Sequence, residues 1–251
     1  MKTSLRSARH LLITVLGLAL AWESAVRVLD VPGYYLPALS VIFQDAWSVR
    51  GLLATSLGHT LLEAVLGFLL GAAFGFACGV LFAHVRMAER AFFPLFVAAK
   101  TVPVIAFGAL VVIWFGNTLM AKVAIAFYLT FFPVTVNTLR GLQACDAEKV
   151  GLLRSFGATD AQLFLRLKLP TALPTIMVGL RLGISLSLIG AIVGEWFGAT
   201  VGLGAMLIQA MYNEQVTRLW LIVLACGTAG ASLYGIIAAL ERRFIWWQGR
   251  A

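Results

Sequence analysis

The sequence is poor in charged residues and in the side chains that most often perform catalysis or bind metals. Only 12% of its 251 residues are charged, and it has three histidines and three cysteines. Cys78, Cys145 and Cys226 show no paired spacing, so neither a disulfide framework nor a metal site is predicted. The sequence contains no Gly-x-x-x-x-Gly-Lys-Ser/Thr motif, which excludes a P-loop for ATP in this chain. We therefore expect no catalytic residue, bound metal or bound cofactor here.

Hydrophobic residues are abundant instead. They make up 61% of the sequence, and the mean hydropathy is +0.94. Soluble domains contain roughly 45 to 50% apolar residues. The composition therefore predicts a polytopic membrane protein that has the lipid bilayer as its solvent.

Six apolar runs are long enough to cross a membrane. They lie at residues 11–29, 57–83, 92–115, 119–140, 172–196 and 218–240. Backbone polar groups must be paired internally in hydrocarbon, so runs of this length are predicted to be helices. The glycines of 67–79 are expected to let helices pack closely. The first run also has features of a signal peptide, but its apolar character continues to Leu29, which favours a span.

The positive charge indicates topology. The net charge is +8, and 13 of the 19 basic residues lie in inside segments if the N-terminus is cytoplasmic. These are Lys2, Arg6, Arg9, Arg86, Arg90, Arg140, Lys149, Arg154, Arg166, Lys168, Arg242, Arg243 and Arg250. The positive-inside rule explains this bias, so both termini are expected in the cytoplasm and no nucleic-acid partner is predicted.

Two segments outside the membrane are long. Residues 30–56 begin with turn residues and continue as a mixed helix over 39–53, in which Trp47 suits a membrane interface. Residues 197–216 are predicted to form a Gly-rich bend followed by a short apolar helix that need not cross the bilayer. Both segments are expected at the rim of a pathway.

The longest inside loop, from about Gly141 to Thr171, contains SFGATDAQLFLRLKLP at 155–170. Gly157 is expected to form a bend, after which Thr159 and Asp160 begin a short helix with apolar residues at helical offsets. Pro170 is expected to end this helix. The pattern alone leaves open a helix on the membrane surface or one that docks on a partner.

The loop resembles the cytoplasmic signature of bacterial ABC importer permeases. That signature is Glu-Ala-Ala, three residues, Gly, nine residues, Ile, one residue and Leu-Pro, and Gly157 and Leu169-Pro170 match its spacing, with Leu167 in place of Ile. The first part is Gly151-Leu152-Leu153 here, with Glu148 upstream. Segments 101–116, 131–142, 169–183 and 194–204 resemble the nitrate, sulfonate and taurine branch of this family.

The resemblance implies an all-α integral membrane fold of the type I ABC importer permease class. Six transmembrane helices and a cytoplasmic coupling helix between helices 4 and 5 are expected. Residues 1–56 would form an N-terminal transmembrane helix and rim segment, and 57–251 the permease domain. The family further implies a homodimer in the bacterial cytoplasmic membrane, partner ABC ATPase subunits that bind ATP and Mg, and an extracytoplasmic solute-binding protein.

The resemblance also implies which residues contact the ATPase. The coupling helix is placed at about 155–165, with Gly157 allowing close approach and Phe164 as the buried anchor. The expected coupling residues are Ser155, Phe156, Gly157, Ala158, Thr159, Asp160, Leu163, Phe164 and Pro170.

Polar residues inside the predicted spans are candidates for the translocation pathway, because charged groups at the bilayer centre are costly. They are Glu63, Lys100, Thr101, Arg181 and Glu195. Lys100 and Thr101 precede Pro103, where a helix break would direct polar backbone toward a cavity. The alternative for each is structural pairing, for example of Arg181 with Glu63, or snorkelling to the surface.

The segments HTLLEAVLGF (59–68) and AKTVPVIAF (99–107) look closer to permeases for thiamine-pyrimidine precursors and related heterocycles than to sulfonate carriers. A nitrate, sulfonate or taurine permease is the alternative. An ion-coupled secondary transporter is disfavoured by the absence of an internal repeat. An intramembrane serine protease is disfavoured because Ser185 has no histidine near it in the sequence.

Overall fold

The computed structural model of the protein describes residues 2–247, without the side chains of residues 2–8, 11 and 12. Of the basic residues that predict orientation, Lys2, Arg6 and Arg250 therefore lie outside the described side chains. The described elements are helices: α1 Lys2–Val28, α2 Leu39–Ser48, α3 Arg50–His84, α4 Arg86–Thr101, α5 Val104–Phe115, α6 Leu119–Gln143, α7 Ala147–Ser155, α8 Asp160–Leu163, the π-helical turn η1 Phe164–Lys168, α9 Leu169–Glu195, α10 Leu203–Tyr212 and α11 Val216–Phe244.

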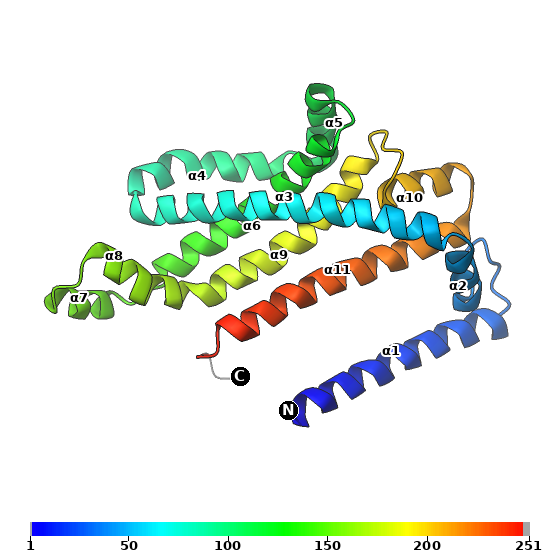
Figure 1. The fold of residues 1–251 in the computed structure, drawn as a ribbon, viewed down its shortest axis with the longest axis horizontal. Coiled ribbons are helices and arrows are strands. Elements are labelled where there is room, and N and C mark those ends of the chain that lie inside the picture. The colour runs from blue at the N-terminus through cyan, green and yellow to red at the C-terminus, as the bar shows by residue number, and fades with distance from the viewer. Residues whose placement is uncertain (1, 248–251) are drawn as a thin grey trace.

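The all-helical membrane fold predicted from the sequence is confirmed. Four helical segments of the described chain are long and apolar enough to cross a membrane: α3, α6, Asp160–Glu195 and α11. The pair α4 and α5 makes a fifth span if it is counted as one bent unit. α7 and α8 lie at one end of the molecule, and the start of α1 and the end of α11 are both directed toward that end (Figure 1).

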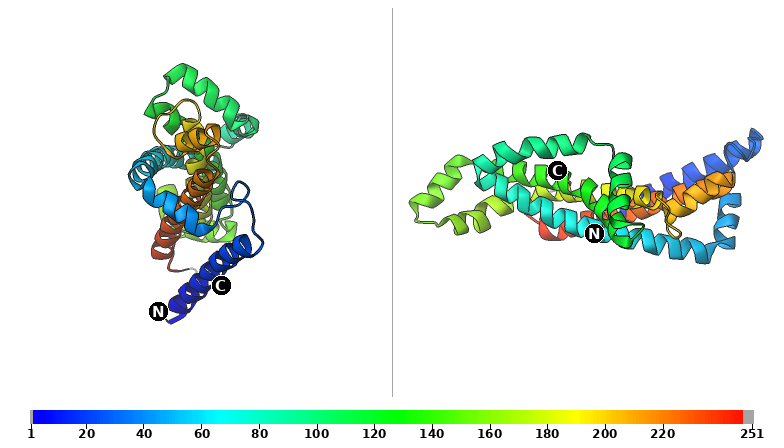
Figure 2. Two further views of the ribbon diagram at one scale, coloured as in Figure 1. Left: turned by 90° about the vertical axis from the view of Figure 1, so that its right-hand side faces the viewer. Right: turned by 90° about the horizontal axis from the view of Figure 1, so that it is seen from above.

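The core of the molecule is the contact of α3, α6 and α9. Every fourth residue of α3 from Gly67 to Gly79 is a glycine, and a Cβ placed at Gly71 would lie 2.7 Å from the Thr130 Cβ of α6. Gly179 and Gly183 of α9 face α6 in the same way. Small residues bring helices together where lipid provides no hydrophobic drive for association. The elongated three-helix core is visible in Figure 1 and in the right-hand view of Figure 2.

The predicted span at 92–115 is not one straight helix. The axes of α4 and α5 differ by 97°, and the bend lies at Val102 and Pro103. Pro103 has no backbone N–H, and the residue before a proline favours extended backbone, as Val102 adopts here with φ −68° and ψ 123°. As a result α5 runs across the direction of α4, and its buried Val111 packs against Ala121 and Ile125 of α6 (Figure 1).

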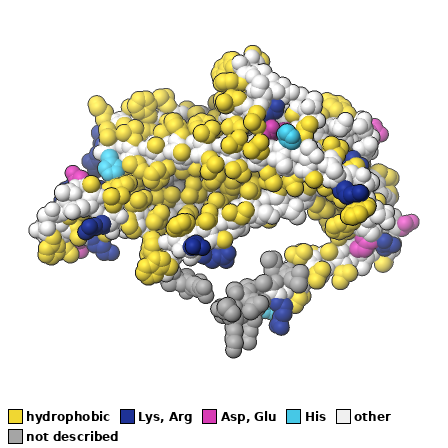
Figure 3. Space-filling model, in the orientation of Figure 1, with side chains coloured by type: hydrophobic (Ala, Val, Ile, Leu, Met, Phe, Trp, Pro, Cys, Tyr) yellow, Lys and Arg dark blue, Asp and Glu magenta, His cyan; other side chains and the backbone are white. Residues whose placement is uncertain are grey.

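The N-terminal part packs loosely on the rest. The Trp22 indole donates to the Pro37 carbonyl at 3.1 Å, and Glu23 accepts from the Ser40 hydroxyl at 2.8 Å, so α1 is held through α2. Trp22 of α1 also meets Trp220 of α11 edge-on, with ring centroids 5.2 Å apart, and from there the two helices diverge (Figure 1). Hydrophobic side chains cover the middle of the molecular face in Figure 3, with Lys and Arg mainly toward its two ends. This is the distribution that a bilayer-embedded surface requires.

The predicted end of the inner helix at Pro170 is wrong. Helical structure runs without interruption from Asp160 to Glu195 through η1. In the wider π turn, the Leu169 N–H donates to the Phe164 carbonyl five residues earlier. Pro170, which has no N–H to continue the hydrogen-bond ladder, follows directly on this π turn, and Pro174 lies within α9.

Candidate functional site

The turn between α7 and α8 is fixed by its own local hydrogen bonds. Gly157 has φ +78°, a left-handed conformation that glycine adopts without cost, and its N–H donates to the Arg154 carbonyl at 2.9 Å. Thr159 and Gln162 form a reciprocal capping box at the start of α8. Asp160 pairs with Arg154 at 3.1 Å on the surface. The turn is therefore a defined structure with an exposed tip.

The residues predicted to couple to an ATPase point in different directions. At the tip, Phe156 is 78% exposed, and Leu152 of α7 is 58% exposed. Leu163 is fully buried within the chain. Ser155 ends α7 with its hydroxyl on the Leu152 carbonyl, and Ala158 lies within the turn.

Phe164 does not point outward as the anchor role requires. Its ring lies edge-on to His84, with centroids 5.4 Å apart, and packs beside Leu142, Ala172 and Ile176. On the helix from Asp160 onward, Leu163 is buried and Phe164 packs beside α6 and α9, whereas the neighbouring Leu165 is 61% exposed. The free aromatic side chain of this turn is Phe156.

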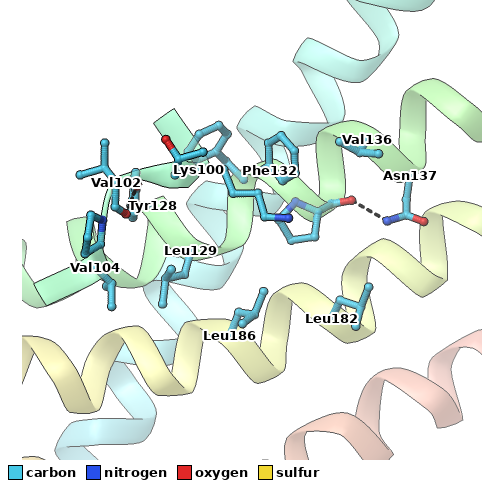
Figure 4. Close-up of a pocket in the computed structure, with 14 residues that line it drawn as sticks. Lys100, Val102, Val104, Tyr128, Leu129, Phe132, Val136, Asn137, Leu182 and Leu186 are labelled. Carbon is cyan, nitrogen blue, oxygen red and sulfur yellow. Dashed lines mark hydrogen bonds between the residues drawn. The ribbon is translucent and has the colours of Figure 1, made fainter. Parts of the chain in front are cut away.

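A cavity of about 550 Å³ lies at the break between α4 and α5. The break, α6 and α9 line it, and Figure 4 shows their side chains around the hollow. The lining residues are Lys100, Thr101, Val102, Pro103, Val104, Tyr128, Leu129, Phe131, Phe132, Pro133, Val136, Asn137, Leu182 and Leu186. Two pathway candidates from the sequence, Lys100 and Thr101, thus share this cavity.

The polar groups of the cavity are few and fixed. The Tyr128 hydroxyl bonds to the carbonyls of Ala99 and Val102, the latter at 3.1 Å, and so satisfies backbone that the helix break frees. The Lys100 ammonium lies 5.0 Å from the centre of the Phe132 ring. The Asn137 amide donates to the Pro133 carbonyl at 2.8 Å (Figure 4). The cavity therefore has an aromatic wall, one cation and one amide.

Arg181 is separate from both the cavity and Glu63. Its guanidinium pairs with Glu241 of α11 at 3.3 Å and lies 5.7 Å from the ring centre of Tyr234. The suggested pairing with Glu63 is therefore wrong, because α9 presents Arg181 to α11. Glu63 and Glu195 instead lie together in the half of the core nearer to α10, both almost fully buried.

Some residues of these sites escaped the sequence reasoning. Lys122 of α6 neighbours Glu63 and Glu195 and is buried, and its charge within an apolar run was a signal for it. Tyr128, Phe132 and Asn137 give no comparable signal, since aromatic and amide residues occur on many helix faces. Among the described residues, no group of three or more His, Cys, Asp or Glu side chains is arranged to hold a metal ion.

Comparisons with known proteins agree with this architecture. A profile of the family described as binding-protein-dependent transport system inner membrane component matches residues 67–246. The formylaminopyrimidine transport permease protein ThiX of Halalkalibacterium halodurans is 34% identical over 234 residues, which cover 93% of this chain and 93% of that protein. The riboflavin transport system permease protein RibX of Chloroflexus aurantiacus is 31% identical over 240 residues, covering 94% of this chain and 89% of that protein.

A solved structure has the same fold. A chain of the MetNI methionine ABC transporter in an inward-facing conformation superposes with a TM-score of 0.70 and 17% sequence identity. The match covers 78% of this chain and 98% of that chain. Because the identity is low, this likeness bears on the fold alone.

Proposed function

Because the chain belongs to the family of binding-protein-dependent transport system inner membrane components and is a multi-pass permease of an ATP-driven importer, we propose that it carries a pyrimidine or related planar heterocycle across the bacterial inner membrane. The observation that carries the proposal is the aromatic cavity at the break between α4 and α5. A flat heterocycle stacks on aromatic faces and offers ring nitrogens and exocyclic groups for hydrogen bonds.

The cavity contains the partners that such a ligand needs. Tyr128 and Phe132 supply ring faces, while Lys100 and Asn137 supply donors. Pro133 lacks an N–H, so the Leu129 carbonyl beside the cavity has no donor four residues later and is available as an acceptor. Nitrate or a sulfonate, the alternative substrates, would use the single cation and leave the aromatic wall unused.

The names of the two relatives support the same class of substrate. ThiX is named for formylaminopyrimidine and RibX for riboflavin, and both compounds are planar nitrogen heterocycles. Pocket chemistry and relatives thus favour a heterocycle, such as a pyrimidine precursor of thiamine, over an inorganic anion.

Energy is supplied by partner subunits. The chain has no P-loop, so ATP and Mg are bound and ATP is hydrolysed by ABC ATPase subunits, and this chain binds no cofactor. Two copies of the chain form the pathway, and an extracytoplasmic solute-binding protein delivers the substrate. With both termini in the cytoplasm, the turn between α7 and α8 faces the ATPase.

The coupling contact is built on the exposed tip of that turn. Phe156 and Leu152 offer apolar surface to a groove of the ATPase, in the manner of an aromatic anchor at an interface. Gly157 allows close approach, and Thr159 and Asp160 fix the helix behind it. Leu163, Phe164 and Pro170 act indirectly, because they join the turn to α9.

The coupling contact is tested by co-purification of tagged permease with its ATPase. Phe156→Asp is expected to lose the ATPase while the permease keeps its thermal stability, because the ring contacts nothing that the fold needs. Phe164→Asp, the matched control, is expected to lower the stability, because it places a charge against His84 and Leu142. Retention of the ATPase by Phe156→Asp would move the contact away from the tip.

The substrate is tested in proteoliposomes that contain the permease, its ATPase and its binding protein. We expect ATP-dependent uptake of labelled formylaminopyrimidine, with competition by other aminopyrimidines and none by taurine or nitrate. Asn137→Leu, which keeps the branched shape and removes the amide, is expected to reduce uptake. Competition by taurine or nitrate alone would establish the anion alternative instead.

A further inference from the structure

We propose that Glu195 and Thr60 are positioning residues that fasten the external helix α10 to α9, so that α10 moves with the inner turn during transport. The inference rests on the proposed coupling of that turn to an ATPase, and it concerns polar groups that the cavity and the turn do not use. We call Glu195 and Thr60 together the α10 cap.

Glu195 holds the N-terminus of α10. Its side chain is 1% exposed, and its Oε2 accepts from the Gly204 N–H at 2.5 Å. Its Oε1 accepts from the Thr60 hydroxyl at 2.6 Å. A carboxylate at a helix N-terminus is favoured by the free N–H groups and by the helix dipole.

Thr60 of α3 completes the arrangement. Besides donating to Glu195, its hydroxyl oxygen accepts from the Leu203 N–H at 2.9 Å. The hydroxyl thus bridges α3, α9 and the first residue of α10. Because Thr60 is fully buried, water cannot replace this bond without opening the core.

The helix has no cap of its own. The residue before α10 is Gly202, which has no side chain and has φ +133°, so the first N–H groups of α10 depend on other elements. A Cβ at Gly202 would overlap the Glu195 carboxyl group. The glycine therefore lets the loop pass directly over the carboxylate.

The loop before α10 is held from a second side as well. The Lys122 ammonium donates to the Asn117 side-chain oxygen, and the Asn117 amide donates to the Gly198 carbonyl. Asn117 precedes α6, so the core helices α3, α6 and α9 all contribute to fixing residues 196–204. α10 lies beside the outer end of α9 in the view of Figure 1.

The far end of the same helix reaches the inner turn. Helical structure is continuous from Asp160 to Glu195 over 36 residues, a length of about 54 Å at 1.5 Å per residue. This continuous helical rod, which contains the π turn and Pro174 near one end, transmits a displacement at one end to the other. The α10 cap bonds α10 to the far end of that rod, so the two are expected to move together. No carboxylate bonds α5 to α9 in this way among the described residues.

The test uses the reconstituted importer and two hydroxyl groups of α3. Thr60→Val removes the Thr60 hydroxyl of the α10 cap at nearly constant volume and leaves the bond from Gly204 to Glu195 in place. Ser56→Ala removes a buried hydroxyl one turn away that has no hydrogen-bond partner among the described residues. We expect Thr60→Val to lower uptake about tenfold while the complex still hydrolyses ATP, so that more ATP is spent per solute. Ser56→Ala is expected to behave as wild type, and Thr60→Ser to restore coupling.

A second pair of variants tests whether coupling depends on the α10 cap itself or on any buried carboxyl group in this part of the core. Glu195→Gln places an amide N–H group against the donors of α10 and is expected to act as Thr60→Val does. Glu63→Gln replaces the adjacent buried carboxyl group, whose Oε2 has no partner among the described residues, with an amide and is expected to retain coupling. Equal loss of coupling in both glutamine variants would overturn the inference.

The outcomes distinguish this inference from the proposed function. A wild type that shows no ATP-dependent uptake contradicts the proposed function. A wild type that transports, together with a Thr60→Val variant that transports equally well, contradicts only the role of the α10 cap. Uptake and ATP hydrolysis that fall in equal proportion in Thr60→Val would also overturn it, because a positioning role predicts their separation.

Discussion

The two ends of the helical run from Asp160 to Glu195 are built by opposite means. At the inner end, Thr159 and Gln162 cap each other three residues apart, on the surface. At the outer end, Glu195 and Leu203 depend on Thr60, which lies 135 and 143 residues away in the sequence. The inner turn is thus local and exposed, whereas the outer turn is long-range and buried.

This difference decides what each end contributes. When a solvent-exposed hydrogen bond of the protein breaks, bonds to water replace it at little net cost. A buried polar group that loses its partner instead carries its full desolvation penalty. The inner turn is therefore free to present side chains to a partner. The outer turn is committed to the fold, and changes there are expected to be more costly.

The largest effect is expected at Gly202. Gly202→Val places a branched side chain at φ +133° and against the Glu195 carboxyl group, and it should lower the free energy of unfolding by about 3 kcal/mol. Thermal unfolding in detergent measures the change. Gly33→Val is the control, because a Cβ at Gly33, in the other external segment, has no neighbour within 4 Å. Similar stability of the two variants would contradict the assigned packing.

The next effect is expected at an outer ion pair. Arg218 of α11 contacts Asp45 of α2 through two bonds of 2.5 and 2.7 Å, and both side chains are mostly buried, at 18% and 20% exposed. Arg218→Ala leaves the Asp45 carboxylate without its partner and should cost about 2 kcal/mol. The same thermal measurement applies. An unchanged unfolding temperature would show that α2 is not held by this pair.

A smaller effect is expected at the inner turn. Gly157→Ala introduces a side chain at φ +78° and should cost about 1 kcal/mol, without any clash, because the space around it is open. Gly151→Ala, six residues earlier on α7, is the matched control and should stabilise by up to about 1 kcal/mol through helix propensity. Opposite signs of the two stability changes would support the left-handed backbone at Gly157, and equal signs would contradict it.

The smallest effect is expected at the inner ion pair. Arg154 and Asp160 are 62% and 89% exposed, so solvent screens their attraction. Arg154→Ala should change the free energy of unfolding by no more than about 0.5 kcal/mol. A loss comparable to that of Arg218→Ala would mean that the inner turn is not the free surface described above.

Local sequence signals anticipated a large part of the fold. Hydropathy identified the apolar helices, Pro103 indicated the break, and the glycines of 67–79 indicated close packing, which the contact of α3 with α6 confirms. The bend at Gly157 and the helix start at Thr159 were also predicted, since both depend on neighbours within a few residues. The short apolar helix after the external bend is confirmed as α10.

Other features depended on how the helices are rotated about their axes. Phe164 and Phe156 are both aromatic residues of one short segment, yet the first packs on His84 and the second is exposed. Arg181 pairs with Glu241, sixty residues away, and not with Glu63. In apolar helices the hydrophobic pattern does not mark the inner face, because lipid and protein interior accept the same side chains.

The sequence by itself determined that this protein is a bundle of membrane helices with an inner turn of defined shape, because apolar length and local capping act over a few residues. The tertiary structure alone decided which polar groups meet within that bundle. The aromatic cavity at the helix break and the bridging of Thr60, Glu195 and α10 both join residues from distant parts of the chain. Their energy comes from burial and mutual hydrogen bonding, which exist only after the helices have packed.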